Sequence, residues 1–212
     1  MRTFTDISIS LDGFVAGPTP TLEEPLGTGG MQLHEWAFRL AAWRRPHGLD
    51  GGEEGPESRW VEEITASTGA YVMGRRMFSG GEGSWHDDPN ANGWWGEEPP
   101  FHAPVFVVTS QPREPLELAG TTFTFVTDGV ESAVAQAREA AAGRDVQVAG
   151  GGSVVRQAYD LGLLDELQVH IAPVLLGAGT PLFRDVTPSS LDLAETIATP
   201  QATHLRYRVT RR

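Results

Sequence analysis

The first clear pattern along the chain is an alternation of apolar and polar side chains over residues 4–11. Apolar residues at four of these positions are separated by threonine, aspartate and serine. A period of two is typical of a β-strand. The Asp12–Gly13 pair that follows is a common turn sequence, so the sequence predicts a strand that ends there.

Helical and strand patterns then alternate. Apolar residues at helical spacing, or runs rich in alanine, predict helices over 31–45, 57–69, 75–81, 130–143 and 153–162. Short apolar runs predict strands over 70–74, 104–110, 121–128, 145–152, 164–177 and 204–212. This order is typical of an α/β sheet with crossover helices. We therefore expect one domain over residues 1–212, with loop insertions around 17–57 and 80–100.

The composition excludes several classes of enzyme. The 212 residues include no cysteine, and all 16 basic residues are arginine. Thiolate chemistry and Cys-based metal centres are therefore excluded, as are a Schiff-base lysine and the lysine of a Walker loop. The net charge of −12 disfavours nucleic acid as a partner. An anionic ligand would have to be bound locally, by arginines and backbone N–H groups.

Membrane and metal signals are weak. No stretch approaches the roughly 20 apolar residues of a membrane helix, and residues 1–17 lack the pattern of a signal peptide. We therefore expect a cytoplasmic protein with no membrane partner. The His34–Glu35 pair has no second histidine at helical spacing, and the acidic stretch 85–90 is typical of an exposed loop. We predict no metal site.

The stretch "VAGGGSVVRQ", residues 148–157, places three glycines between a predicted strand and a predicted helix. Glycine lets backbone N–H groups approach a ligand closely, and the start of a helix attracts phosphate. We expect Ser153 to cap this helix. A tight turn at a sheet edge is the alternative, because the spaced glycines of a dinucleotide fingerprint are absent.

Two more predicted strands end in groups that suit an anionic ligand. "VMGRRMF" (72–78) is a strand, a glycine and a helix start with two arginines, whose planar guanidinium suits phosphate. "VVTSQP" (107–112) ends in small hydrogen-bonding side chains. Ligands of open α/β sheets bind beyond the carboxyl ends of the strands. The three strand ends could together hold a long anionic cofactor.

Taken in order, these motifs resemble the dihydrofolate reductase-like family, and more closely its branch with the reductase domain of bacterial riboflavin biosynthesis proteins. "SLDGFVAG" is similar to the first strand and active-site loop, and "VMGRRMF" to the first glycine step. "VFVVTSQP" is similar to the adenosine-side strand, "VQVAGGGSVVRQ" to the pyrophosphate turn, and "HIAPVLLGAGTPLF" to a late strand and loop. The resemblance implies a mixed, mostly parallel sheet flanked by helices.

The resemblance also implies an NADPH site. Its residues are Gly150, Gly151, Gly152, Ser153 and Val154 at the pyrophosphate turn; Gly74, Arg75, Arg76 and Met77 at the first glycine step; Thr109, Ser110 and Gln111 on the adenosine side; and Ser8, Val15 and Ala16 beside the nicotinamide. In dihydrofolate reductases a cis peptide joins the first two glycines of the turn, so we expect one at Gly150–Gly151. Met77 stands where the family has threonine, which removes one hydroxyl from the pyrophosphate site.

The match fails on the substrate side. Folate reductases carry a carboxylate on the first active-site helix, and that register falls on Ser58, between Glu57 and Glu62. The riboflavin-type reductases do without this carboxylate. The stretch 33–38 could supply the missing group through His34, Glu35 or Trp36, and Asp12 lies beside the expected nicotinamide pocket. Asp12, Glu35 and Trp36 are the candidate catalytic residues. The alternatives are a turn former for Asp12, a core residue for Trp36 and a solvated helix face for His34 and Glu35.

Two functions from different classes remain. One is an NADPH-dependent reductase, a cytoplasmic homodimer that acts on a small heterocyclic molecule of the pterin or ribosylaminopyrimidine type. The other is a non-catalytic nucleotide-binding protein that retains the reductase fold.

Overall fold

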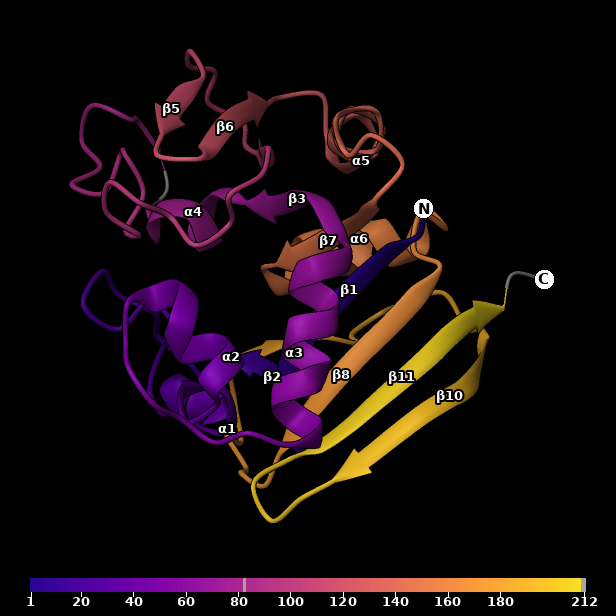
Figure 1. Cartoon of the computed structure of the whole chain (residues 1–212). Helices are drawn as coiled ribbons and strands as arrows, with labels where there is room; N and C mark the ends of the chain where they lie inside the picture. The colour runs from indigo at the N-terminus through magenta and orange to yellow at the C-terminus, as the bar shows by residue number, and fades with distance from the viewer. Residues whose placement is uncertain (82, 211–212) are drawn as a thin grey trace.

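The computed structural model of the chain describes residues 1–81 and 83–210 (Figure 1). Its strands are β1 (Thr3–Ser10), β2 (Phe14–Ala16), β3 (Thr68–Gly74), β4 (Val105–Val108), β5 (Leu116–Leu118), β6 (Thr121–Val126), β7 (Asp145–Gly150), β8 (Glu166–Ala172), β9 (Thr180–Pro181), β10 (Ser190–Ala198) and β11 (Thr203–Thr210). Its helices are η1 (Gly30–His34), α1 (Glu35–Phe38), α2 (Ala41–Arg44), η2 (Arg45–His47), α3 (Pro56–Ser67), α4 (Arg75–Ser79), α5 (Val130–Ala140) and α6 (Gly152–Asp160).

Nine of the strands in the described residues form one sheet, in the order β10–β11–β8–β1–β7–β3–β4–β6–β5. The strands from β8 to β6 pair in parallel, whereas β11 and β10 on one side and β5 on the other pair antiparallel. The short strands β2 and β9 pair separately. The mixed, mostly parallel sheet confirms the α/β fold class.

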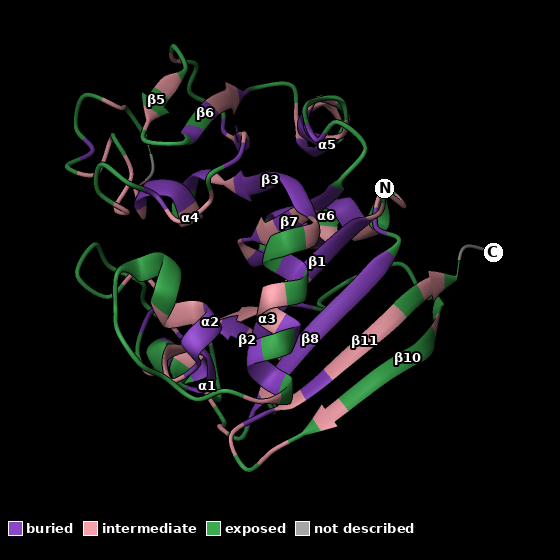
Figure 2. Cartoon of the chain, viewed as in Figure 1, coloured by how far each residue is buried: buried purple, intermediate pink, exposed green. Residues whose placement is uncertain are grey.

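Helices cover both faces of the sheet. On one face, Ile7 and Ile9 of β1 belong to the core cluster that also contains the buried sides of α5 and α6. On the other face, Phe4 packs with Trp60 and Ile64 of α3. Figure 2 shows the result: β8, β7 and β1 are buried, and β10 at the edge is largely exposed.

The polar positions of β1 are the unexpected feature of this core. A strand that alternates apolar and polar residues usually has one solvated face, but seven of the eight residues of β1 are buried and Asp6 is half-buried. The reason is that β1 lies at the centre of the sheet, with α3 covering the face that carries Asp6 and Ser8. Buried polar groups need partners, and these partners form the candidate site described below.

The single helix predicted over 31–45 is wrong, because the chain forms four short helical segments there instead. Leu40 interrupts them with an extended backbone, ψ 138°. It is bridged to Glu53, whose N–H donates to the carbonyl of Arg39 and whose carbonyl accepts from the N–H of Ala41. The backbone at 39–41 thus forms its hydrogen bonds with Glu53, outside the predicted helix, and the helix cannot continue through Leu40.

One predicted strand is shorter than expected, and four strands are not predicted from the sequence. The strand predicted over 164–177 ends at Ala172, and β10 was not predicted at all. β10 is an antiparallel edge strand whose side chains are mostly exposed, so it lacks the apolar run that marks a central strand. The strands β2, β5 and β9 are too short to leave a pattern.

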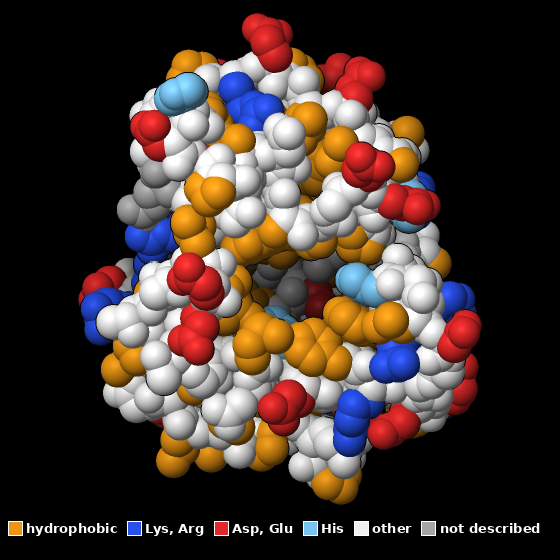
Figure 3. All heavy atoms as spheres, turned by 90° about the vertical axis from the view of Figure 1, so that its left-hand side faces the viewer, with side chains coloured by type: hydrophobic (Ala, Val, Ile, Leu, Met, Phe, Trp, Pro, Cys, Tyr) orange, Lys and Arg blue, Asp and Glu red, His pale blue; other side chains and the backbone are white. Residues whose placement is uncertain are grey.

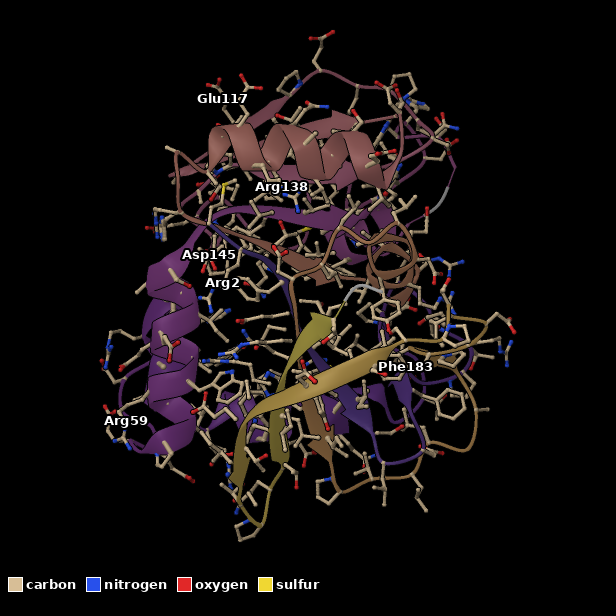
Figure 4. All side chains as sticks on the ribbon, turned by 90° about the vertical axis from the view of Figure 1, so that its right-hand side faces the viewer. Arg2, Arg59, Glu117, Arg138, Asp145 and Phe183 are labelled. Atoms are coloured by element: carbon tan, nitrogen blue, oxygen red, sulfur yellow. The ribbon has the colours of Figure 1, made fainter. Side chains whose placement is uncertain are left out.

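The amino ends of three central strands are tied together by one arginine, at the edge opposite the predicted ligand site. Arg2 and Asp145 approach one another beneath α5 in Figure 4, with Nη2 of Arg2 2.6 Å from Oδ2 of Asp145. Arg2 also donates through Nη1 to Glu166. These bonds link the starts of β1, β7 and β8, and they lower the pKa of Asp145 against the raising effect of burial.

Candidate functional site

Four parallel strands bring their carboxyl ends to one edge of the sheet. β3 pairs with β7 up to Met73 opposite Gly150, and with β4 up to Gly74 opposite Val108. β1 lies on the other side of β7. The three strand ends singled out in the sequence therefore lie side by side. Figure 3 looks onto this edge and shows a hollow rimmed by hydrophobic side chains, with a carboxylate and a histidine visible inside.

The glycine turn at the end of β7 has the predicted cis peptide between Gly150 and Gly151. α6 begins directly afterwards at Gly152, and Gly151 is its N-cap. The expectation that Ser153 caps the helix is wrong, because the helix starts one residue earlier and Ser153 lies in its first turn. No side chain caps this helix, so the first N–H groups point out of the helix start without a side-chain acceptor.

Glycine is required at this turn because neighbouring groups approach it closely. A Cβ on Gly150 would lie 3.0 Å from Sδ of Met77, and Gly150 has φ 146°. A Cβ on Gly152 would lie 2.7 Å from Cγ2 of Val15. A Cβ on Gly74 would lie 3.0 Å from Cγ2 of Val154. Six of the predicted cofactor residues are thus gathered in one closely packed turn, in which the neighbours of these glycines leave little room for a Cβ.

The two arginines at the start of α4 have different surroundings. Arg75 is 9% exposed, and its Nη2 lies 2.5 Å from Oδ2 of Asp88, whose side chain is fully buried. Nε of Arg75 donates to Ser79, and its guanidinium lies 3.2 Å from the ring centre of Trp85. Arg76 is exposed. Arg75 therefore holds the loop at 83–100, and Arg76 is the arginine that presents its side chain to solvent.

The third strand end, at the end of β4, is in contact with the loop at 83–100. Thr109 is buried, and its Oγ1 accepts from the N–H of Gln111. Ser110 and Gln111 are exposed, and the carbonyl of Gln111 accepts from Nε1 of Trp85. Arg113 also lies over the ring of Trp85. The loop at 83–100 thus builds one wall beside the predicted adenosine side.

The residues predicted beside the nicotinamide lie where β1 passes into β2. Ser8 is buried, Val15 contacts the glycine turn, and Ala16 is half-buried. Nε1 of Trp36 donates to Oγ of Ser8 at 3.0 Å. Because an indole N–H can only donate, this bond leaves the hydroxyl hydrogen of Ser8 for another acceptor. Trp36 is a core residue that orients Ser8.

The two carboxylates proposed as catalytic residues lie outside this centre. Asp12 is exposed, and its carboxylate accepts from the backbone N–H groups of Leu176 and Gly177. A hydrogen bond from Ser10 contributes most to lowering the pKa of Asp12. Glu35 is exposed at the start of α1. Asp12 has a structural task, since it fixes the loop that follows β8.

A buried chain of four titratable side chains lies between α3 and the sheet, and sequence reasoning did not find it. Nε2 of His170 lies 2.8 Å from Oδ2 of Asp6, and Nδ1 of His170 lies 2.7 Å from Nδ1 of His204. Nε2 of His204 lies 2.8 Å from Oε1 of Glu57. Both imidazoles are 1% exposed. The ring of Trp36 packs on both, so this chain lies directly behind Ser8.

The position that corresponds to the carboxylate of folate reductases is occupied by a serine, Ser58. Ser58 is fully buried, and its Oγ accepts from the N–H of Ala42. Its neighbour Glu57 turns toward the sheet and reaches His204 instead. The only sequence signal for this arrangement was the run of polar residues in β1, together with histidines inside two predicted strands.

Buried histidines make the stability of the protein depend on pH. Burial, and then charge on His170, lowers the pKa of His34 to about 4 and also lowers the pKa of His204. An unfolded histidine titrates near 6.5, so the folded state binds fewer protons below that pH. We expect the free energy of unfolding to fall from pH 6.5 towards pH 4, by about 1.4 kcal/mol per pH unit for each proton.

Urea unfolding at pH 7, 6, 5 and 4.5 would measure this dependence. Replacing the half-buried His34 with glutamine should remove part of the slope, because glutamine does not titrate. An equal slope in both proteins would contradict the role of His34.

Two further observations bear on the class of protein. Within residues 1–81 and 83–210, no group of three or more histidine, aspartate or glutamate side chains is arranged to hold a metal ion. Over the same residues, every helix is too short or too polar to cross a lipid bilayer.

The fold is that of the dihydrofolate reductase-like proteins. The structure is similar to that of a putative riboflavin biosynthesis protein from Shewanella sp. PV-4, with a TM-score of 0.65, 19% identity and 100% of both chains covered. It is also similar to a diaminohydroxyphosphoribosylaminopyrimidine deaminase/5-amino-6-(5-phosphoribosylamino)uracil reductase from Thermotoga maritima. That match has a TM-score of 0.56 and 14% identity, and covers 99% of this chain and 56% of that one.

The family model described as the RibD C-terminal domain matches residues 4–205, and the chain belongs to this family. Two Bacillus subtilis proteins, described as uncharacterized proteins YyaP and YwjB, are similar in part. YyaP is 48% identical over 44 residues, 21% of this chain and 23% of that protein. YwjB is 32% identical over 85 residues, 40% of this chain and 48% of that protein. The matches thus span less than half of either relative.

Proposed function

We propose that the protein is an NADPH-dependent reductase that acts on a small heterocycle of the ribosylaminopyrimidine or pterin type. The observation that carries this proposal is the patch of side-chain-free backbone at Gly74, Gly150 and Gly152, beside an uncapped helix start. A helix start with free N–H groups attracts phosphate. The patch also lies beyond the carboxyl ends of parallel strands, where open α/β sheets bind their ligands.

Each part of the chain would have its own task in holding the cofactor. Residues 150–154 would bind the pyrophosphate, and Arg76 would bind the adenosine 2′-phosphate. Residues 109–111 would line the adenosine side, and Ser8, Val15 and Ala16 the nicotinamide. Arg75 would act indirectly, by fixing the loop at 83–100. Bound NADPH would supply the hydride and both electrons of the reduction.

The first substrate to test is 5-amino-6-(5-phosphoribosylamino)uracil, the compound in the name of the similar Thermotoga maritima enzyme. The protein would reduce its sugar portion, and NADPH oxidation would report the reaction. Dihydrofolate is the second compound to test, because folate-type reductases share the fold. Oxidation of NADPH with neither compound would count against this substrate class.

NADPH binding is expected to depend on Arg76. Titration of the protein with NADPH, followed by quenching of tryptophan fluorescence, should give salt-sensitive binding that is tighter than that of NADH. Arg76→Ala removes one charge-assisted hydrogen bond, worth about 1–3 kcal/mol, so NADPH should bind roughly 5- to 150-fold more weakly.

Arg59→Ala is the matched control for that titration, because Arg59 is exposed on α3, away from the strand ends (Figure 4). It should leave NADPH affinity unchanged. If the unmodified protein bound neither nucleotide, the glycine turn would have to be regarded as a structural turn. Binding without reduction of any compound would favour a non-catalytic nucleotide-binding protein.

The proposal includes a homodimer in the cytoplasm with a small molecule as its substrate. Leu175, in the stretch that follows β8, and Leu193, on the edge strand β10, are large and exposed apolar side chains. Leu175 belongs to the apolar stretch 170–177, which is the proposed contributor to the dimer interface. Sedimentation velocity would measure the oligomeric state, and a monomer at micromolar concentration would contradict the dimer.

A further inference from the structure

The buried chain of Asp6, His170, His204 and Glu57 is the strongest feature that the proposed cofactor site does not use. Ser8, His170 and His204 are register partners across β1, β8 and β11, so the two imidazoles share a row of the sheet with a residue proposed to line the nicotinamide. Asp6 lies two residues before Ser8 and on the same face of β1. Two positions along a strand span about 7 Å.

The hydrogen bonds of this chain require three protons. Each of its three contacts, Asp6 to His170, His170 to His204 and His204 to Glu57, needs one hydrogen between its two atoms. Two neutral imidazoles carry one ring hydrogen each, and ionised carboxylates carry none. The geometry therefore requires one proton more than the ordinary forms of these groups at neutral pH.

The third proton is assigned to a histidine, because an imidazole is ordinarily more basic than a carboxylate, and both carboxylates accept further hydrogen bonds. Nε1 of Trp60 donates to Oδ2 of Asp6 at 3.4 Å, and the hydroxyl of Thr199 donates to Oε1 of Glu57 at 3.1 Å. Burial and charge on His170 lower the pKa of His204. The third proton is placed on His170, because its Nε2 lies 2.8 Å from Oδ2 of Asp6, at the end of the chain nearer to Ser8.

Other charged or titratable groups face the chain from the surrounding elements. Two of them are His34 of η1 and Tyr71 of β3: burial, and then the charge of His170, lowers the pKa of His34, and burial raises the pKa of Tyr71, with a smaller contribution from Asp6. Arg206 of β11 lies over the ring of Trp60, 4.3 Å from the ring centre, and pairs with Glu63 and Glu195. None of these groups interrupts the three contacts of the chain.

The two ends of the chain differ from its middle in being accessible. The side chain of Asp6 is 19% exposed and that of Glu57 is 11% exposed, whereas both imidazoles are closed off from solvent. Asp6 uses Oδ2 for both of its hydrogen bonds. Its Oδ1 has no hydrogen bond among the residues that the structure describes, and Asp6 lies on the same face of β1 as Ser8.

We propose that Asp6 is the catalytic residue that gives the substrate its proton, and that His170, His204 and Glu57 resupply it. This inference rests on the proposed reductase function. Reduction of a C=N or C=O bond adds a hydride to carbon and a proton to nitrogen or oxygen. Nε2 of His170 passes its proton to the carboxylate of Asp6, which passes it to the substrate. Bound NADPH would supply the hydride and both electrons, and a proton taken up from bulk solvent at Glu57 would restore the third proton.

The proton count can be measured on the protein without any ligand. Nitrogen-15 spectra of the histidine rings between pH 6 and 8 should show His170 with both nitrogens protonated and His204 neutral. A shielded N–H signal shared by the two Nδ1 atoms should be lost in His204→Gln, which also assigns it. Spectra in which both rings carry one hydrogen each throughout this pH range would overturn the proposal.

The catalytic role is tested by single-turnover oxidation of NADPH with 5-amino-6-(5-phosphoribosylamino)uracil, or with dihydrofolate if only that compound is reduced. Asp6→Asn should lower the rate of hydride transfer 10²- to 10⁴-fold, the usual contribution of a positioned acid. Its affinity for NADPH should stay within twofold. His170→Gln should lower the rate less, and should change the pH profile because it removes the group that passes a proton to Asp6.

Glu57→Gln and Glu62→Gln form a matched pair on α3, since Glu62 pairs with Arg45 at the surface. Only Glu57→Gln should change the pH profile. An unchanged rate in folded Asp6→Asn would overturn the inference and leave the reductase function intact. A wild-type protein that binds NADPH but reduces neither compound would overturn both.

Discussion

Replacing Arg75 with alanine should destabilise the protein by about 3–5 kcal/mol, the usual effect of removing one partner of a buried ion pair. The reason is that the carboxylate of Asp88 is fully buried and lies 2.5 Å from Nη2 of Arg75. The hydrogen bond from Ser79 would remain, but it cannot neutralise the charge. The guanidinium would also leave the face of Trp85. Urea unfolding at pH 7 would measure the loss.

Two variants separate this effect from cofactor binding. Arg76→Ala changes the next residue of the same helix, which is exposed, and should leave the free energy of unfolding within about 0.5 kcal/mol of the parent. Adding Asp88→Asn to Arg75→Ala removes the unpaired charge and should recover part of the stability. If Arg75→Ala kept full stability and lost only NADPH affinity, Arg75 would be a phosphate ligand and not the anchor of the loop at 83–100.

The same ion pair predicts a loss of stability in acid. Burial raises the pKa of Asp88, but the hydrogen bonds from Arg75 and Ser79 outweigh it, so that the pKa lies below its usual value. A carboxylate with a lowered pKa stabilises the folded state above its unfolded pKa of about 3.9, and the contribution is lost as the pH falls through the folded value. Below about pH 4, this loss of stability from Asp88 adds to the loss that the histidines cause between about pH 6.5 and pH 4.

The glycine turn could be predicted from the sequence because its cause is local. Three adjacent glycines between an apolar strand and an amphipathic helix leave little choice of conformation, and parallel strands bring their carboxyl ends to one edge. The positions of Gly74, Gly150 and Thr109 in the fold follow from these facts alone. Their role in binding NADPH stays a prediction.

The substrate side could not be predicted because its contacts are not local. Asp6, Glu57, His170 and His204 belong to four elements and are separated by up to about 200 positions. In sequence, a polar residue in an alternating strand indicates a solvated face, and only the covering helix α3 reverses that inference. Arg75 is a similar case: its partner Asp88 lies in a loop without periodicity, so the charge suggested a phosphate ligand.

Gly152→Ala should both destabilise the protein and weaken its affinity for NADPH. The new Cβ would lie 2.7 Å from Cγ2 of Val15 and 3.4 Å from Cγ2 of Thr180. Val15 is buried and β-branched, so it cannot rotate away freely. β2 must therefore move away from the turn, and overpacking of this kind costs about 1–3 kcal/mol.

A double-mutant cycle identifies the steric cause of that loss. Val15→Ala alone removes buried methyl groups and should also destabilise the protein, but in the Gly152→Ala background it removes the clash as well. The two changes should therefore cost less together than the sum of their separate effects, by about 0.5–3 kcal/mol of coupling. NADPH affinity should recover in parallel, because β2 can return to the turn and restore the wall of the proposed nicotinamide pocket. Additive effects would mean that Val15 is not the residue that clashes with the new Cβ, and that another neighbour makes glycine necessary at position 152.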